Sequence, residues 1–348
     1  MAIKNSGGKM NSDNLFDNLL EFAQKKLEKN PENPDFEQIL KYASKQFLET
    51  MQSNEENDIN VLNTEYDDFN KRNYVRWKTG FQKLQMLCQI SIDAGMDFQK
   101  QFLQYPEYEH DPLLGVLMRQ HANACKITGE IIHLLKGGYA DGALARWRTL
   151  FEIAVTCLIL NKHGKEAAED YIKHGTLKTI EEIEEYQKTA TDMNLEPYSD
   201  DEINIAIKLK KDLSNGEADF KWARKYTGFG KMEKLREYIG LGKWSHNYML
   251  ASKNIHADYH EIRSLLAMSE AKEDMLLVGQ SNSGMTEPAS MTAISLGQIT
   301  TAFLTAYMND QNTKLNYINS TFYILAIKQY IDDVDTEFLK CEQKVIKE

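Results

Sequence analysis

Arg148 and Glu152 lie within a largely apolar stretch near the middle of the chain, at residues 137–160 (GGYADGALARWRTLFEIAVTCLIL). Arg148 and Glu152 are four residues apart, so a helix places them on the same face. Arginine before glutamate is the less favourable order for a surface pair, which indicates that both point into the bundle. Because buried charges need partners, this spacing predicts either a structural ion pair or an arginine that a carboxylate positions for a ligand.

Hydroxyl and imidazole groups recur every four residues about a hundred residues later, at Tyr248, Ser252, His256 and His260. On a helix these four side chains form one polar stripe. Histidine exchanges protons near neutral pH, so His256 is a candidate general base with Tyr248 and Ser252 as hydrogen-bonding neighbours. The alternative is a buried imidazole that these hydroxyls merely satisfy.

Metal-ligating residue types occur as a Glu-x-x-His motif, Glu130 and His133, and as the pair His256 and His260. Di-iron bundles need two Glu-x-x-His helices and two further glutamates, and no second predicted helix carries such a motif here. We therefore predict no metal site and no cofactor. A metal-dependent helical-bundle enzyme that uses these four residues with Glu152 is the alternative.

Basic and aromatic residues are interleaved between Lys208 and Lys243, where ten Lys or Arg face five Asp or Glu. Single-stranded nucleic acid needs cations for its phosphates and aromatic rings for its bases. This segment predicts RNA as a partner, bound by Lys221, Trp222, Arg224 and Lys225. Short helices docked by their aromatic residues, with the lysines in water, are the alternative.

Composition restricts the class of protein. The chain has 348 residues, 42% of them hydrophobic, and a net charge of −11, which argues against indiscriminate binding to nucleic acid. Its four cysteines form no CxxC pair, and no apolar run is long enough to span a bilayer. The first residues lack the apolar region of a secretory signal. We expect a cytoplasmic protein that does not enter a membrane.

Helical periodicity runs through nearly the whole chain, without the alternation typical of strands. The fold class expected is therefore all-α, a bundle of long antiparallel helices with an amino-terminal helical hairpin. Residues 1–60 form the leader and hairpin, and residues 61–348 form the main bundle. Helices are expected at residues 14–29, 34–51, 62–103, 110–136, 139–160, 244–268, 291–308 and 315–339, with two more flanking the acidic region 166–202.

Two connecting segments carry further predictions. Residues 53–60 (SNEENDIN) are expected to be a polar linker, so the hairpin before them is a candidate surface for a protein partner or for homo-oligomerisation. Residues 279–284 (GQSNSG) are either an anion-binding concavity before a helix or a plain surface loop.

Four segments in order resemble a large uncharacterised bacterial family, a domain of unknown function: GYADGALARWRTLFEIAV, DFKWARKY, YMLASKNIHAD and VGQSNSGMTEP. The resemblance covers roughly residues 66–329. Its most specific parts are Arg148–Glu152 and the Ser252-x-x-x-His256 spacing. The residues that it marks are Arg148, Glu152, Trp222, Tyr248, Ser252 and His256, and it implies no activity.

A looser resemblance is to the helical HEPN superfamily, whose members include RNA-cleaving toxins and phage-defence effectors. It implies a compact, often dimeric bundle that needs no metal. In that chemistry a histidine assists attack by the ribose 2′-hydroxyl and an arginine steadies the phosphate. The usual Arg-x(4–6)-His spacing is absent here, so Arg148 and His256 must meet across helices.

The leading hypothesis is thus a bacterial defence or stress protein with a HEPN-like, metal-independent ribonuclease site. Arg148 holds a phosphate, Glu152 orients Arg148, and His256 acts as base. The alternative class is a non-enzymatic helical scaffold or sensor, in which the same residues form only a polar network in the core.

Overall fold

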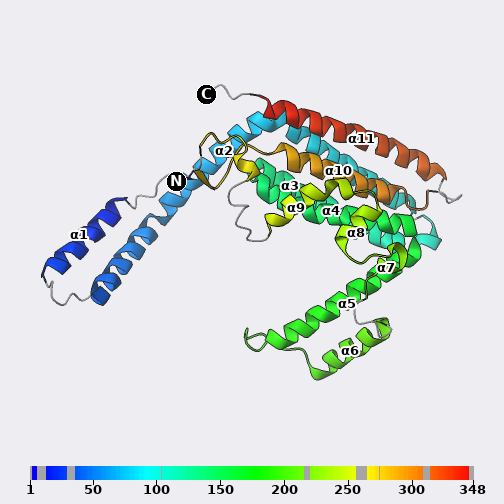
Figure 1. The fold of residues 1–348 in the computed structure, drawn as a ribbon, viewed down its shortest axis with the longest axis horizontal. Coiled ribbons are helices and arrows are strands. Elements are labelled where there is room, and N and C mark those ends of the chain that lie inside the picture. Colours follow the sequence, from blue (N-terminus) through cyan, green and yellow to red (C-terminus); the bar gives the residue numbers. More distant parts are fainter. Residues whose placement is uncertain are drawn as a thin grey trace.

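The protein is an all-α bundle from which two helical hairpins project (Figure 1). The computed structural model describes residues 2–5, 13–29, 36–102, 104–214, 220–255, 265–273, 275–308 and 314–344. No helix within these ranges is long and apolar enough to cross a membrane. The all-α class predicted from the periodicity is confirmed.

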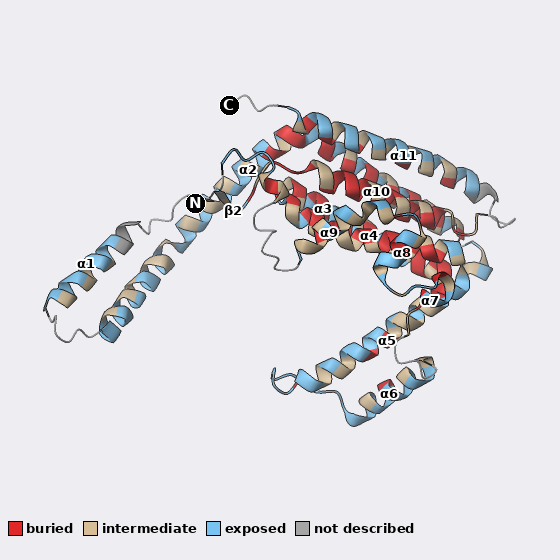
Figure 2. Cartoon of the chain, viewed as in Figure 1, coloured by how far each residue is buried: buried red, intermediate tan, exposed pale blue. Residues whose placement is uncertain are grey.

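Helix α10 (Thr286–Leu304) lies at the centre of the bundle. It packs against four other helices: α2 (Phe36–Phe102), α3 (Pro112–Lys136), α4 (Ala140–His163) and α11 (Lys314–Glu342). Most of its residues are small or apolar, so neighbours approach it on several sides and nearly all of it is buried. Figure 2 shows the buried residues concentrated in α3, α4 and α10.

Helix α2 is continuous over 67 residues, so the predicted linker at residues 53–60 is wrong. The sequence SNEENDIN contains neither glycine nor proline, and its polar residues are tolerated on a helix exposed to water. The same helix therefore serves the hairpin and the bundle. Whether residues 1–60 behave as a separate domain stays a prediction.

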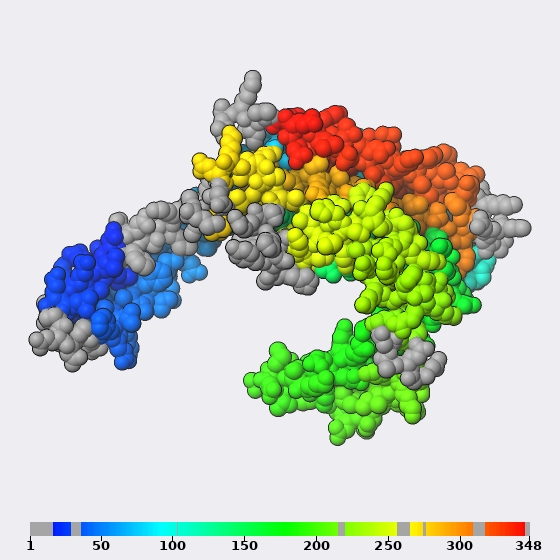
Figure 3. Space-filling model, viewed as in Figure 1, coloured from blue at the N-terminus to red at the C-terminus, as the bar shows by residue number. Residues whose placement is uncertain are grey.

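The first projection pairs α1 (Asp13–Lys29) with the N-terminal half of α2. Its helices meet through a stacked pair, Phe22 and Tyr42, whose ring centroids are 4.2 Å apart. Buried residues of α2 begin only at Asn73. Figure 3 shows this arm extending away from the rest of the molecule. A hairpin was predicted here, and its second helix is longer than expected.

The middle of the chain forms the second projecting hairpin and also the short helices that lie over α4. Helices α5 (Lys165–Thr189) and α6 (Asp200–Ser214) form the projecting hairpin. Three short helices follow them: α7 (Arg224–Thr227), α8 (Met232–Tyr238) and α9 (Ser245–Lys253), of which α8 and α9 contact α4. The described residues also include 3₁₀ turns at Pro106–Tyr108, Gly242–Trp244 and Leu266–Met268.

Helix α9 is shorter than the helix predicted at residues 244–268. It ends at Lys253, where the amide of Ile255 donates to the carbonyl of Ser252 in a tighter 3₁₀ turn. Tyr248 and Ser252 of the predicted polar stripe lie on α9. The second half of the stripe, with His256 and His260, lies outside the described residues.

Two strands that the periodicity did not predict pair in parallel. Strand β1 (Ala2–Asn5) runs beside β2 (Met275–Val278), with Ala2 opposite Met275 and Asn5 opposite Val278. Four residues are too few for an alternating pattern to be recognisable in the sequence. This pairing brings the amino terminus to the loop that precedes α10.

Candidate functional site

One side of helix α4 packs against α10. This packing determines which residues of α4 lie on its other side. The indole Nε1 of Trp147 donates to the carbonyl of Met291 at 3.0 Å and to Ser295 Oγ at 2.9 Å. Arg148 and Glu152 share the neighbouring face of α4, and there they meet α9.

Arg148, Glu152 and Tyr248 form one hydrogen-bonded cluster. Arg148 Nε donates to Glu152 Oε1 and to the Tyr248 hydroxyl, both at 3.1 Å. The same hydroxyl donates to Glu152 Oε1 at 2.5 Å. Three of the predicted site residues, from two helices a hundred residues apart, therefore touch. Only Nε of the Arg148 guanidinium is engaged by described residues.

This cluster is not in the core, contrary to the expectation that both charges point into the bundle. The side chain of Arg148 is 24% exposed and that of Glu152 is 35% exposed. Helix α9 covers the pair only in part, which leaves the charges within reach of water. An exposed part of each group lowers the cost of holding the charge, and a solute can reach it.

A second guanidinium, that of Arg236, lies against the same tyrosine. Its Cζ is 4.8 Å from the Tyr248 ring centroid, and the Cζ of Arg148 is 4.9 Å from it. Arg236 is 6% exposed, and its Nε has no hydrogen-bond partner among the described residues. The cluster thus holds two guanidinium groups beside one carboxylate.

Sequence reasoning missed Arg236, although it lies inside the basic and aromatic segment. Counting cations in a segment does not show which of them is buried. Tyr238 lies two residues further on, where its ring contacts Lys162 and its hydroxyl hydrogen-bonds His163. As an aromatic residue it stands out in this segment more than Arg236 does. No spacing in the sequence connects Arg236 with Tyr248.

The hydrogen bonds keep Tyr248 protonated and Arg148 charged. Burial raises the pKa of Tyr248, and donation to the Glu152 carboxylate raises it further. Burial alone would lower the pKa of Arg148. The bond to Tyr248 and the charge of Glu152 outweigh it, so the pKa of Arg148 lies above its usual value.

Ser252 takes no part in the bonds of this cluster. Ser252 Oγ donates to the carbonyl of Tyr248 at 2.7 Å, which uses its proton within α9. His256 lies outside the described residues. Its role as base stays a prediction.

The predicted RNA contacts line a single cavity of about 430 Å³. Its lining residues are Asp170, Lys173, Ser214, Phe220, Lys221, Trp222, Arg224 and Lys225. Trp222 is buried, and Tyr171 packs against its ring at a centroid distance of 5.1 Å, so this indole is no free stacking surface. Phe220 is more exposed, with Lys173 Nζ 4.4 Å from its ring centroid. The alternative of short helices docked by aromatic residues describes Trp222 better.

Carboxylates neutralise part of the positive charge of this cavity. Lys225 Nζ lies 3.5 Å from Glu166 and 3.7 Å from Asp170. A hydrogen bond with Tyr226 is the main cause of the raised pKa of Lys225, and these carboxylates add to it. Since Lys173 also lines the cavity, four cationic side chains face one lining carboxylate.

No three potential metal ligands gather anywhere in the described ranges. The proposed ligand Glu130 bonds Arg146, and Glu152 bonds Arg148 and Tyr248. His133 is exposed on the same helix as Glu130 and lines another cavity, and His260 is outside the described residues. The alternative of a metal-dependent enzyme therefore gains no support from the residues that are described.

The GQSNSG segment is held as a structural loop. The hydroxyls of Ser281 and Ser283 both donate to the carbonyl of Ala267. Gly284 has a φ of +77°, and a Cβ there would lie 2.3 Å from the carbonyl oxygen of Leu266. The small residues thus allow close packing against residues 266–268.

Comparison with known proteins supports the resemblance to an uncharacterised family. Residues 114–274, less than half of the chain, match the model of a family of unknown function (DUF5677). The match includes Arg148, Glu152, Arg236 and Tyr248. No curated protein and no solved structure matches the chain.

Proposed function

We propose that this protein binds single-stranded RNA and cleaves it without a metal, as a HEPN-like ribonuclease in bacterial defence or stress. The observation that carries the proposal is the arrangement around Tyr248. Two guanidinium groups lie against one ring with a single carboxylate, so a phosphate is the complementary ligand. Resemblance to the HEPN superfamily supplies the reaction type.

Each residue of the cluster has a distinct role in this proposal. Arg148 offers its terminal nitrogens to a phosphate, because only its Nε is bonded by described residues. Glu152 holds that guanidinium in place. Tyr248 ties the two together and, being neutral, adds no negative charge that would repel the phosphate.

The covalent step is a transfer within the RNA. The ribose 2′-hydroxyl gives its proton to a base, for which His256 is the candidate, and its oxygen bonds to phosphorus. The bond from phosphorus to the 5′-oxygen breaks, and that oxygen takes up a proton. Arg148 stabilises the charge that develops on the phosphoryl oxygens. The products are a 2′,3′-cyclic phosphate and a 5′-hydroxyl.

The basic cavity at α5 and α7 supports the choice of a polymer over a small phosphate. Lys173 and Lys221 lie there beside Phe220, which combines cations with an accessible ring. Helix α8, which carries Arg236, follows α7 in the chain. One RNA strand that occupies both sites would contact the segment 220–248.

Arg148→Ala tests the proposal directly. Single-stranded RNA is incubated with the protein in excess EDTA, and cleavage products are resolved by size and by their 2′,3′-cyclic ends. We expect a loss of about a hundredfold or more, as for removal of a group that stabilises charge in a transition state. Circular dichroism and the unfolding midpoint show whether the variant is folded.

Arg119→Ala is the matched control, because Arg119 is exposed on α3 and bonds only its own helix, at the carbonyl of Gly115. It should cleave as the wild type does. If the wild-type protein does not cleave RNA under these conditions, or if both variants behave alike, the ribonuclease proposal fails.

A second candidate function is that of a helical scaffold, and the arm favours it. Leu20 on α1 and Leu40 and Leu48 on α2 are each more than half exposed. A two-helix hairpin cannot bury such side chains by itself. Co-precipitation that depends on these leucines and not on Arg148 would favour the scaffold over the enzyme.

A further inference from the structure

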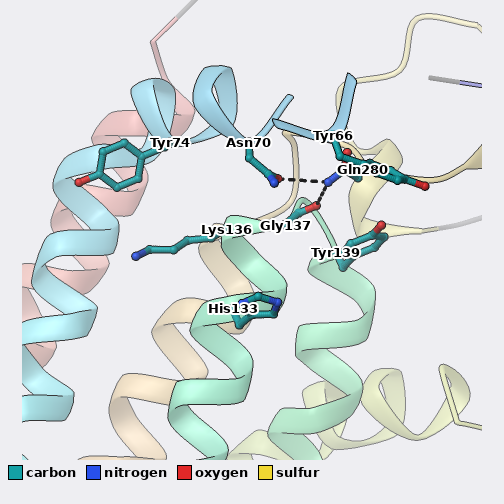
Figure 4. A pocket seen from close by; sticks show the side chains of 8 residues that line it. All are labelled: Tyr66, Asn70, Tyr74, His133, Lys136, Gly137, Tyr139 and Gln280. Carbon is teal, nitrogen blue, oxygen red and sulfur yellow. Dashed lines mark hydrogen bonds between the residues drawn. The ribbon is translucent and has the colours of Figure 1, made fainter. Parts of the chain in front are cut away.

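A second cavity lies where α2, α3 and α4 meet, more than two helical turns before Arg148 along α4 (Figure 4). Its volume is about 380 Å³, which is in the range of small-molecule pockets. Its lining residues include His133 and Lys136 on α3, Tyr139 at the start of α4 and Tyr66 on α2, and Figure 4 shows Lys136 extending away from the other three toward Tyr74. None of these residues belongs to the proposed ribonuclease site.

Side-chain amides offset part of the repulsion that the C-terminus of α3 would exert on an anion at this junction. The carbonyls of Leu135 and Lys136 accept hydrogen bonds from Asn73 Nδ2 at 3.0 and 2.9 Å. The carbonyl of Gly137 accepts one from Gln280 Nε2 at 2.8 Å. Because both amides are buried, these bonds are shielded from water. The carbonyl oxygens that would face a ligand are therefore already occupied.

The cavity surface also offers hydrogen-bond donors. Lys136 is half-buried, and no described carboxylate pairs with it. Burial lowers the pKa of Lys136. His133 and the Tyr66 and Tyr139 hydroxyls have no hydrogen-bond partner among the described side chains. No aspartate or glutamate lines the cavity.

Aromatic rings border the cavity on opposite sides. Tyr66 and Tyr139 lie on one side, and Lys136 extends toward Tyr74 on the other, with its Nζ 5.7 Å from that ring centroid. Burial and the nearby Tyr66 raise the pKa of Tyr139, so its hydroxyl stays a donor. A ligand that fits must present a flat apolar face and an anionic group together.

We propose that this cavity binds a small planar aromatic anion of the nucleoside monophosphate class. The ring packs against Tyr139 and Tyr66, and the phosphate contacts Lys136 and His133. The Gln280 amide, which also donates to Asn70 Oδ1 at 3.2 Å, fixes the loop that closes the cavity. This site is independent of RNA cleavage.

Isothermal titration calorimetry of the full-length protein with AMP tests the assignment. We expect saturable binding, with adenosine and inorganic phosphate each at least tenfold weaker than AMP. Lys136→Ala and Tyr139→Ala should each weaken AMP binding at least tenfold. Lys126→Ala is the matched control, since Lys126 is exposed on the same helix outside the cavity, and it should bind as the wild type does.

Three results would overturn the proposal: no saturable binding of AMP, equal loss in the Lys126 and Lys136 variants, or equal affinity for AMP and inorganic phosphate. Arg148→Ala should retain the wild-type affinity for AMP. If Arg148→Ala also loses AMP binding while it remains folded, AMP occupies the ribonuclease site and the assignment to this cavity is wrong. Loss of cleavage alone leaves this inference standing.

Discussion

At the scale of single residues, Tyr248 connects everything in the cluster. Its hydroxyl joins Glu152 and Arg148, and its ring lies against both arginines. Tyr248→Phe keeps the ring and removes the hydroxyl. We expect it to lower the free energy of unfolding by about 1–2 kcal/mol, because two bonds to charged groups are lost. RNA cleavage should fall with it. Urea denaturation measures the first effect, with Tyr317→Phe, an exposed tyrosine, as control.

His121 predicts how stability depends on pH. Burial lowers the pKa of His121 to about 4, and its ring packs on Phe303 at a centroid distance of 5.2 Å. The unfolded state, with a pKa near 6.5, therefore binds a proton first as pH falls. Up to about 3 kcal/mol of stability is present above pH 6.5 and is lost between 6.5 and 4. The test compares the urea unfolding midpoint at pH 7 with that at pH 4.5. In His121→Phe the two midpoints should lie closer together than in the wild type. In the control His110→Gln, which replaces an exposed histidine, the difference should stay as in the wild type.

At the scale of elements, the turn between α3 and α4 depends on Gly138. Its φ is +82°, and a Cβ there would lie 2.5 Å from the Phe69 ring and 2.9 Å from the carbonyl oxygen of Ser281. Gly138→Ala should cost about 3 kcal/mol, from backbone strain and overpacking together. Gly228 has a φ of +78° with open space around it, so Gly228→Ala isolates the strain and should cost about 1 kcal/mol. Equal losses in thermal unfolding would exclude the steric contribution.

The helices that could be predicted from the sequence are those whose sequence patterns depend only on nearby residues. Apolar spacing and the glycine pair at residues 137–138 sufficed for α3, α4, α10 and α11, because these depend on neighbours along the chain. The linker at 53–60 was misplaced because polar composition alone does not end a helix. For the site, residue type and spacing were enough to predict Arg148, Glu152 and Tyr248. Arg236 could not be found, since its position depends on how α8 packs.

At the scale of the whole molecule, the arm predicts self-association. Leu40 and Leu48 are 66% and 57% exposed, and Phe36 is 58% exposed near the same helix end. A second copy can cover them with its own arm. In sedimentation velocity, Leu40→Gln with Leu48→Gln should shift the protein toward the monomer. The free energy of unfolding should change by less than about 0.5 kcal/mol, as expected for exposed sites. A monomeric wild-type protein would contradict this prediction.

The unbroken course of α2 gives the arm a mechanical property. Residues 36–72 carry no buried side chain and form a rod of about 55 Å that is rooted in the bundle from Asn73 onward. A rotation of about 10° at the root would displace the far end by roughly 10 Å, given that length. Tyr66, Asn70 and Tyr74 at the root also line the second cavity. The arm can thus act as a lever whose pivot lies beside the second cavity, the one proposed to bind a small molecule.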